Sequence, residues 1–173
     1  KQLFTISTNF SRKNFENGGE EFIERLQSTM KRYEIEPQYI EIEITEGVIV
    51  ENLQSLKQCL LKLEELGYRI AIDDFGTGYS NFDYMKDKMF QILKVDRSFV
   101  TDINLNNNNS ILVGFMIKMA HEMGVKICAE GVETKGELDT ITALGADYIQ
   151  GYYFSKPLPQ QEYLKFIEGK NHS

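Results

Sequence analysis

Short hydrophobic runs rich in β-branched residues alternate along the chain with segments of helical periodicity. Between the runs, hydrophobic residues recur at three- and four-residue spacing, which predicts helices over Gly19–Tyr33, Asn52–Leu66, Ser110–Met123 and Glu133–Leu144. The runs themselves predict six strands, at Leu3–Phe10, Tyr39–Thr45, Tyr68–Phe75, Ile92–Asp96, Val125–Val132 and Tyr148–Phe154. This alternation indicates an α/β fold with a parallel sheet, either doubly wound or closed as a barrel.

Chain length limits how much of a barrel these strands can form. A complete (β/α)8 TIM-type barrel takes about 250 residues, whereas this chain has 173. If the fold is a barrel, this chain therefore supplies six of its eight βα units. We expect one domain over residues 1–168 and a disordered tail over residues 169–173, with the asparagine-rich stretch Asn104–Asn109 as an exposed connection.

Polar residues recur near the ends of the predicted strands. In Glu41-Ile42-Glu43-Ile44-Thr45 the isoleucines share one face, so Glu43 projects from the other. An acidic doublet, Asp73-Asp74, closes the next strand. Catalytic groups of barrels lie at the carboxyl ends of strands. Closure of the sheet would therefore gather around one mouth Asn9, Glu43, Asp73, Asp74, Lys94, Glu130 and Gln150.

These residue types suggest cation chemistry. Carboxylate and amide oxygens without histidine or cysteine suit hard ions such as Mg²⁺, Mn²⁺ or Ca²⁺. Two such ions can clamp a phosphodiester, and a lysine among them can neutralise developing charge. Structural explanations remain open: the acidic doublet can cap a helix, Lys94 and Asp96 can form an internal salt bridge, and the two amides can satisfy loop backbone groups.

Composition narrows the possible partners. The formal charge of −7 argues against the broad basic surface that long nucleic acids need, while a small phosphate ligand held through metal ions stays compatible. Cys59 and Cys128 are too few for a disulfide framework, which favours a reducing cytoplasm. The sequence has no apolar run long enough to suggest a transmembrane helix, so we expect no membrane contact from this segment.

A series of motifs at these positions resembles, in order, the EAL family of cyclic di-GMP phosphodiesterases. The match extends over nearly the whole chain. The matching segments are Thr8-Asn9-Phe10-Ser11, Glu43-Ile44-Thr45-Glu46, the loop Asp73–Ser80 (DDFGTGYS), the strand Leu93–Phe99 (LKVDRSF), Ala129–Thr134 (AEGVET) and Gln150–Pro157 (QGYYFSKP).

The resemblance implies a phosphodiesterase that opens cyclic di-GMP to linear pGpG with Mg²⁺ or Mn²⁺ in a two-metal site. It implies that Glu46 anchors the loop Phe75–Ser80. It also implies catalytic roles for Lys94, Glu130 and Asp74 and ligand-binding roles for Gln150, Asp96 and Phe75. The implied metal ligands are Asn9, Glu43, Asp73, Asp74 and Glu130.

Further expectations concern partners and setting. The family resemblance implies a homodimer through the region around the Asp73–Ser80 loop, an upstream sensory or GGDEF-type domain, and a cytoplasmic location, free or as part of a membrane-anchored signalling protein. The alternatives are a non-hydrolytic cyclic di-GMP receptor and an inactive fragment.

Two departures from the family pattern accompany the resemblance. The Glu-Ala-Leu motif is not in the sequence, so we expect this chain to be the C-terminal part of a barrel domain. In addition, Lys88-Met89-Phe90-Gln91 replaces a common Leu-Pro-Val-Asp, at a place that the resemblance puts near the ligand edge.

Overall fold

The fold is built on a parallel sheet whose strands follow one another in sequence order. The computed structural model describes residues 4–77, 83–86 and 89–170. Neighbouring strands pair in the order β1-β2-β3-β4-β5-β6. This order excludes the doubly wound alternative, whose strand order reverses at a switch point. The strands are β1 (Ile6–Asn9), β2 (Ile40–Thr45), β3 (Arg69–Phe75), β4 (Ile92–Val95), β5 (Lys126–Ala129) and β6 (Tyr148–Ile149).

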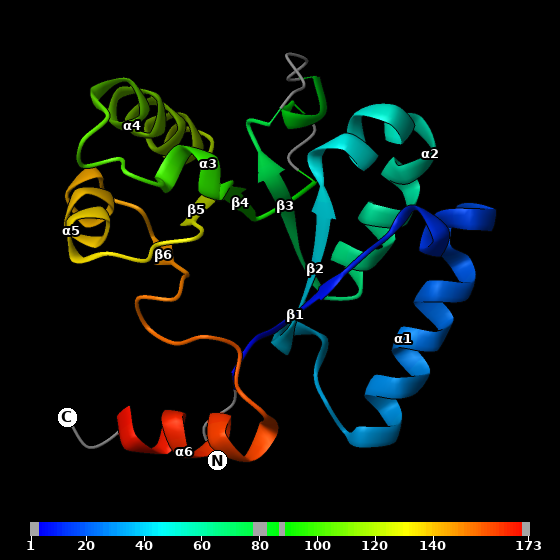
Figure 1. The fold of residues 1–173 in the computed structure, drawn as a ribbon. Helices are drawn as coiled ribbons and strands as arrows, with labels where there is room; N and C mark the ends of the chain where they lie inside the picture. The colour runs from blue at the N-terminus through cyan, green and yellow to red at the C-terminus, as the bar shows by residue number, and fades with distance from the viewer. Residues whose placement is uncertain (1–3, 78–82, 87–88, 171–173) are drawn as a thin grey trace.

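Helices surround the outer side of the curled sheet. Figure 1 shows α1 and α2 flanking one side of the curl, and α4 and α5 flanking the other. The six-stranded half-barrel is therefore confirmed. The helices are α1 (Glu20–Tyr33), α2 (Glu46–Glu65), α3 (Arg97–Val100), α4 (Asn107–Glu122), α5 (Lys135–Leu144) and α6 (Gln160–Lys170), with 3₁₀ turns η1 (Arg12–Gly19), η2 (Pro37–Tyr39) and η3 (Asp83–Met85).

Several helix boundaries differ from the sequence prediction. Helix α2 begins at Glu46 rather than Asn52, and α3 and α6 were not predicted. Helix α6 continues to Lys170, into the segment expected as a tail, and residues 171–173 lie outside the described residues. Among the described residues, no helix combines the length and the apolar character needed to cross a membrane.

The asparagine-rich stretch is in part a helix start. The side chain of Asn106 accepts hydrogen bonds from the backbone N–H groups of Asn108 and Asn109, at 3.1 and 3.2 Å. An asparagine in this position satisfies donors that the first helical turn leaves free. Residues 104–108 are exposed, as expected, but the second half of Asn104–Asn109 is not a connection because it opens α4 at Asn107.

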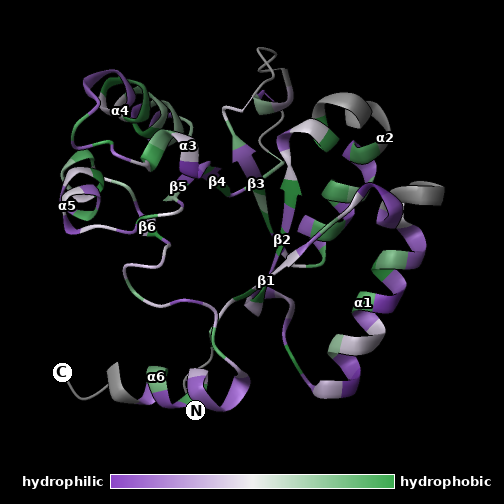
Figure 2. Ribbon diagram, in the orientation of Figure 1, coloured by the Kyte–Doolittle hydropathy of each residue, from purple (hydrophilic) through white to green (hydrophobic). Residues whose placement is uncertain are grey.

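The hydrophobic core lies between the outer face of the sheet and the helices. Ile42 and Ile44 of β2 are fully buried, as are Leu56 and Leu63 of α2. The alternation that turns these isoleucines outward turns Glu43 inward. Figure 2 shows the same alternation of hydrophobic and hydrophilic residues along the strands. Packing of the outer face therefore fixes which side chains enter the hollow of the half-barrel.

Gln91, the last residue of the Lys88–Gln91 segment, lies at the amino ends of the strands. The Gln91 backbone N–H donates to Ile70 O at 2.9 Å, and Gln91 O accepts from Lys126 N–H at 2.9 Å. Ile70 and Lys126 are at the beginnings of β3 and β5. The expectation that this segment lies near a ligand edge is therefore wrong for Gln91, and Lys88 lies outside the described residues.

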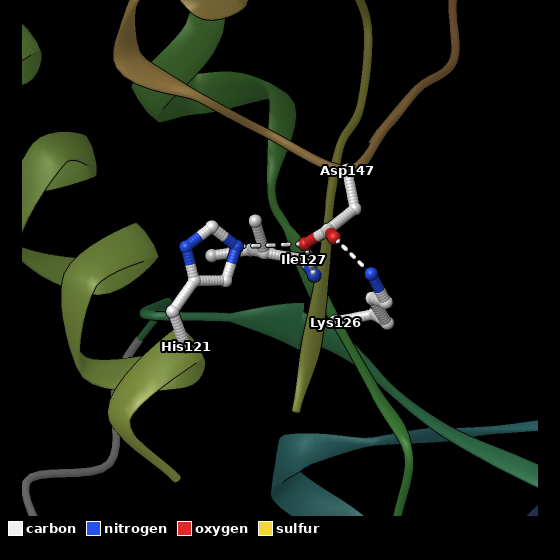
Figure 3. Close-up of polar contacts among 4 residues, drawn as sticks. All are labelled: His121, Lys126, Ile127 and Asp147. Atoms are coloured by element: carbon white, nitrogen blue, oxygen red, sulfur yellow. Dashed lines mark hydrogen bonds and ion pairs between the residues drawn. The ribbon is translucent and has the colours of Figure 1, made fainter. Parts of the chain in front are cut away.

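A polar cluster ties α4, β5 and the residue before β6 together at the same amino end (Figure 3). Asp147 Oδ2 lies 2.8 Å from His121 Nε2 and accepts from the Ile127 N–H at 3.0 Å. Its Oδ1 accepts from Lys126 Nζ at 2.6 Å. Burial acts to raise the pKa of Asp147, but these donors outweigh it and lower the pKa to about 2.

We expect Asp147→Ala to lower the free energy of unfolding by about 1–3 kcal/mol, because the Ile127 N–H loses its acceptor. The lowered pKa means that the charge of Asp147 stabilises the fold above its ordinary pKa, and that this contribution fades as pH falls from about 4 towards 2. Urea unfolding across that range measures it. The exposed Asp139→Ala is the control, and an effect equal to that of Asp147→Ala would contradict the account.

Candidate functional site

One lysine collects carboxylates from the ends of three other strands. Lys94 Nζ lies 2.6 Å from Glu43 Oε1, 2.6 Å from Glu130 Oε1 and 3.3 Å from Asp73 Oδ1. Lys94 is only 4% exposed, because it projects from β4 into the hollow of the curled sheet. Strand alternation and the curl together bring these four predicted site residues to one place, which we call the Lys94 cluster.

The charges of the Lys94 cluster support one another. Burial disfavours the ammonium form of Lys94, but hydrogen bonds to Glu130 and Glu43 and the charge of Asp73 outweigh burial and raise its pKa. Lys94 therefore stays positively charged at neutral pH. Burial raises the pKa of Glu130, and the pairing with Lys94 opposes this shift. Three carboxylates around one ammonium leave the cluster with an excess of negative charge.

A β-bulge presents the acidic doublet at the end of β3. The register between β3 and β4 shifts between Ile72 and Phe75. Asp73 and Asp74 therefore both lie opposite one residue of β4, Lys94. Asp74 has a φ of 55°, a left-handed conformation that aspartate tolerates better than most residues. Burial, and then the charges of Asp73 and Asp96, raise the pKa of Asp74. Asp74 is thus electrostatically coupled to the Lys94 cluster.

The remaining predicted site residues lie around the cluster with different contacts. Asn9 is in register with Glu43 on the neighbouring strand, so the two side chains share a face. Gln150 lines a hollow of about 210 Å³ together with Glu130. Asp96 accepts a hydrogen bond from Ser98 N–H at 3.0 Å and caps α3, so it does not form the internal salt bridge with Lys94 considered above.

Phe75 and Glu46 lie behind the site. Phe75 is 2% exposed and packs in the core, so its side chain does not line the mouth. Glu46 is buried, and its Oε2 accepts from Gly76 N–H at 3.1 Å, which holds the beginning of the loop. Its Oε1 accepts from the hydroxyl of Tyr84 at 2.8 Å. Tyr84 was not predicted, because nothing in the sequence pattern links it to Glu46.

The donor set fits a hard cation, although its oxygens now converge on the ammonium of Lys94. Asp73 Oδ1 is buried and accepts no hydrogen bond. Carboxylate oxygens of this kind are the ligands of Mg²⁺, Mn²⁺ and Ca²⁺. Among the described residues, no group of three or more Asp, Glu, His or Cys side chains is arranged to hold a metal ion directly. The three carboxylates of the Lys94 cluster surround the ammonium instead.

Cysteine chemistry is disfavoured at the site. Cys128 is in register with Lys94 on the inner face and is buried. Burial raises the pKa of the Cys128 thiol to about 12, so the nucleophilic thiolate is scarce at neutral pH. The chemistry of the site therefore rests on its oxygen ligands and Lys94.

Comparison with known proteins identifies the family. The family model described as EAL domain matches residues 1–157. The chain belongs to the EAL domain family. The EAL domain described here is 36% identical over 163 residues to the signaling protein YkoW of Bacillus subtilis, covering 94% of this chain and 20% of YkoW. It is 38% identical over 129 residues to the cyclic di-GMP phosphodiesterase NbdA of Pseudomonas aeruginosa, and this match covers 75% of this chain and 16% of NbdA.

Solved structures agree with the fold of this EAL domain. The EAL enzyme Bd1971, in a form with cAMP and cyclic di-GMP bound, superposes with a TM-score of 0.88 at 35% identity, over 95% of this chain and 43% of that one. BlrP1 of Klebsiella pneumoniae, in a manganese and cyclic di-GMP complex, superposes with a TM-score of 0.83 at 26% identity. This match covers 90% of this chain and 39% of the BlrP1 chain. The chain spans about a fifth of the length of the curated relatives that it matches first.

We expect Lys94→Met to lower the free energy of unfolding by about 3–5 kcal/mol at neutral pH, because it leaves buried carboxylates without their counter-charge. The loss should shrink at lower pH, because protonation of Glu130, whose pKa is raised by burial, relieves the repulsion. Added Mn²⁺ should also restore part of the lost stability. Thermal unfolding with and without Mn²⁺ measures both effects. Lys118→Met, at an exposed position of α4, is the control. Equal stability of Lys94→Met and wild type at neutral pH would contradict the electrostatic account.

Proposed function

We propose that this EAL domain hydrolyses cyclic di-GMP to linear pGpG with Mg²⁺ or Mn²⁺ bound at the carboxyl ends of its strands. The observation that carries the proposal is the Lys94 cluster, in which Glu43, Asp73 and Glu130 surround one buried ammonium. The name of NbdA and the cyclic di-GMP complexes of Bd1971 and BlrP1 support the same substrate.

In this proposal the oxygen ligands are Asn9, Glu43, Asp73, Asp74 and Glu130. Metal ions held there supply a bound water of lowered pKa and positive charge beside the phosphodiester. The manganese and calcium complexes of BlrP1 support a divalent cation in this family. Mg²⁺ or Mn²⁺ is our choice because these ions are smaller than Ca²⁺ and hold a bound water in a tighter and more regular coordination shell.

Lys94 acts in this proposal as a fixed positive charge. Its raised pKa keeps the ammonium protonated, so Lys94 donates hydrogen bonds and does not serve as a general base. Such a donor holds the attacking water or neutralises charge that develops on phosphate. Gln150 borders the hollow beside Glu130 and is proposed to contact the ligand there, while Asp96 contributes through its charge near Asp74.

Glu46 is proposed as the anchor of the loop that follows β3. Its hydrogen bond from the Gly76 N–H fixes the loop where it leaves the strand. Gly76 has a φ of 96°, and a side chain there would approach Phe99 within 2.9 Å and Met116 within 3.1 Å. The base of the loop therefore packs directly on α3 and α4, and residues 78–80 of the loop lie outside the described part.

A homodimer through the region around this loop is the proposed assembly. Helix α4 exposes Ile111, Leu112 and Phe115, with Phe115 68% exposed, close to the Met116 that the loop contacts. A second copy covering these side chains would remove apolar surface from water. An upstream sensory or GGDEF-type domain and a cytoplasmic setting complete the proposal. The two buried free cysteines are consistent with a reducing compartment.

The function is tested by incubating the chain, alone and within its full-length protein, with cyclic di-GMP and Mg²⁺ or Mn²⁺, and following pGpG by chromatography. We expect cleavage that falls by about 100-fold or more in Asp73→Asn, because this change removes a charged oxygen from the cation site. Asp147→Asn, which alters a carboxylate at the opposite end of the strands, is the matched control and should keep its rate.

Two outcomes would overturn hydrolysis. Binding of cyclic di-GMP by calorimetry without any pGpG would make the domain a receptor. Absence of both binding and cleavage in the full-length protein would remove cyclic di-GMP as the ligand.

We expect Phe115→Glu to weaken self-association, because it places a charge in the apolar surface of α4. Sedimentation equilibrium over a range of protein concentrations measures the dimer constant. Tyr163→Glu, an exposed aromatic residue of α6, is the control. If Phe115→Glu and the wild type associate equally, the dimer does not use this face.

A further inference from the structure

One buried carboxylate, that of Glu137, lies outside both the Lys94 cluster and the sequence motifs quoted above. Glu137, in the first turn of α5, is 3% exposed. Its Oε2 accepts from the Glu133 N–H at 2.8 Å and from the Thr134 N–H at 2.9 Å. Its Oε1 accepts from the Asp102 N–H at 3.0 Å. Three backbone donors thus surround this one side chain.

A helix cap explains only part of this arrangement. Thr134 and Glu137 form a capping box, in which Glu137 N–H donates to Thr134 Oγ1 at 3.3 Å and the glutamate reaches back to Thr134 N–H. The box requires one oxygen of the carboxylate. The other oxygen binds Asp102, which is 35 residues earlier in the chain and has a φ of 55°. Glu137 therefore joins two segments that α5 itself does not connect.

One segment follows β4, which carries Lys94, and the other follows β5, which ends directly before Glu130. Asp102 comes after β4 and α3, and Glu133 comes three residues after Glu130. The segments also meet at Gly131, where an added Cβ would lie 2.5 Å from the Cβ of Arg97. Glu130 leaves its strand immediately before this contact. A shift between the two segments would thus move Glu130 relative to Lys94.

We propose that Glu137 is a positioning residue for the site, because its carboxylate holds the segment after β5 against the segment after β4 and so sets Glu130 against Lys94. The consequence for catalysis rests on the proposed function, whereas the placement of Glu130 does not. Displacements of about 1 Å in a reacting group are enough to cost much of its activity.

The electrostatics of Glu137 suit a permanent clamp. Burial acts to raise its pKa, but the hydrogen bonds from Glu133, Asp102 and Thr134 outweigh burial and lower the pKa. The carboxylate is therefore charged at neutral pH. Its contribution is present above the ordinary pKa of a glutamate and is lost only as pH falls through the lowered value.

Glu137→Gln tests the proposal, because it keeps the shape of the side chain but turns one acceptor oxygen into an NH₂ group that cannot accept from an amide. We expect faster hydrogen exchange at the Asp102 or Glu133 amide and a shifted ¹⁵N resonance of Lys94 Nζ. We further expect about tenfold weaker Mn²⁺ binding and a lower kcat for cyclic di-GMP with KM little changed. Glu137→Asp, which retracts the carboxylate but keeps its charge, should give smaller shifts in the same direction.

Ile141→Val is the matched control, since Ile141 is fully buried one turn further along α5. It should lower the unfolding temperature without moving the Lys94 resonance or Mn²⁺ affinity. An unchanged Lys94 resonance in both Glu137 variants overturns the proposal and leaves Glu137 as a helix cap only. That resonance is recorded without metal or nucleotide, so it decides the proposal even if the domain neither binds Mn²⁺ nor cleaves cyclic di-GMP.

Discussion

The site depends on the attraction between one buried ammonium and the carboxylates of three other strand ends. Lys94 cannot remain charged inside the half-barrel without Glu43, Asp73 and Glu130, and these acids cannot lie so close together without Lys94. The ion pairs are therefore a constraint on the fold as well as a chemical device. They require β2, β3, β4 and β5 to end at a common level, which the parallel order of the strands provides.

The two ends of the sheet are fixed by different means. At the amino ends, Asp147 joins α4 and β5 through His121, Lys126 and the Ile127 backbone. At the carboxyl ends, Glu46 and Glu137 each bind backbone N–H groups of segments that border the site. The contacts that stabilise the fold at the amino ends of the strands are thus separate from the candidate site at their carboxyl ends. Substitutions at Asp147 should act on folding, while those near Glu130 act on the site.

Much of this arrangement could be read from the sequence, because strand alternation has a fixed period. Once Ile42 and Ile44 were assigned to the core, Glu43 had to face inward, and the same reasoning placed Lys94. The partners of Lys94 could not be derived this way. A pair with Asp96 was equally compatible with the sequence, and only the start of α3 shows why Asp96 binds Ser98 instead. The choice depends on where the backbone turns after β4.

Long-range polar contacts were the part that the sequence did not reveal. Asp147 meets His121 across 26 positions, and Glu137 meets Asp102 across 35, with no periodic signal at either pair. The sequence did not predict that α2 begins at Glu46 for a related reason. The first turn of α2 is held by the hydrogen bonds that Glu46 accepts from Gly76 and Tyr84, which are distant in the sequence. Local patterns therefore predicted the six strands and four of the helices, but not α3 or α6, and tertiary contacts decided how the ends of these elements are fixed.

The most direct test of this account is anomalous diffraction from crystals of the domain grown with Mn²⁺. The account predicts a manganese peak at about 2.0–2.3 Å from carboxylate oxygens of Asp73 and of Glu43 or Glu130. It also predicts that the peak disappears in Asp73→Asn. A peak confined to surface carboxylates, with the Lys94 cluster unchanged, would contradict the claim that these strand ends form a cation site.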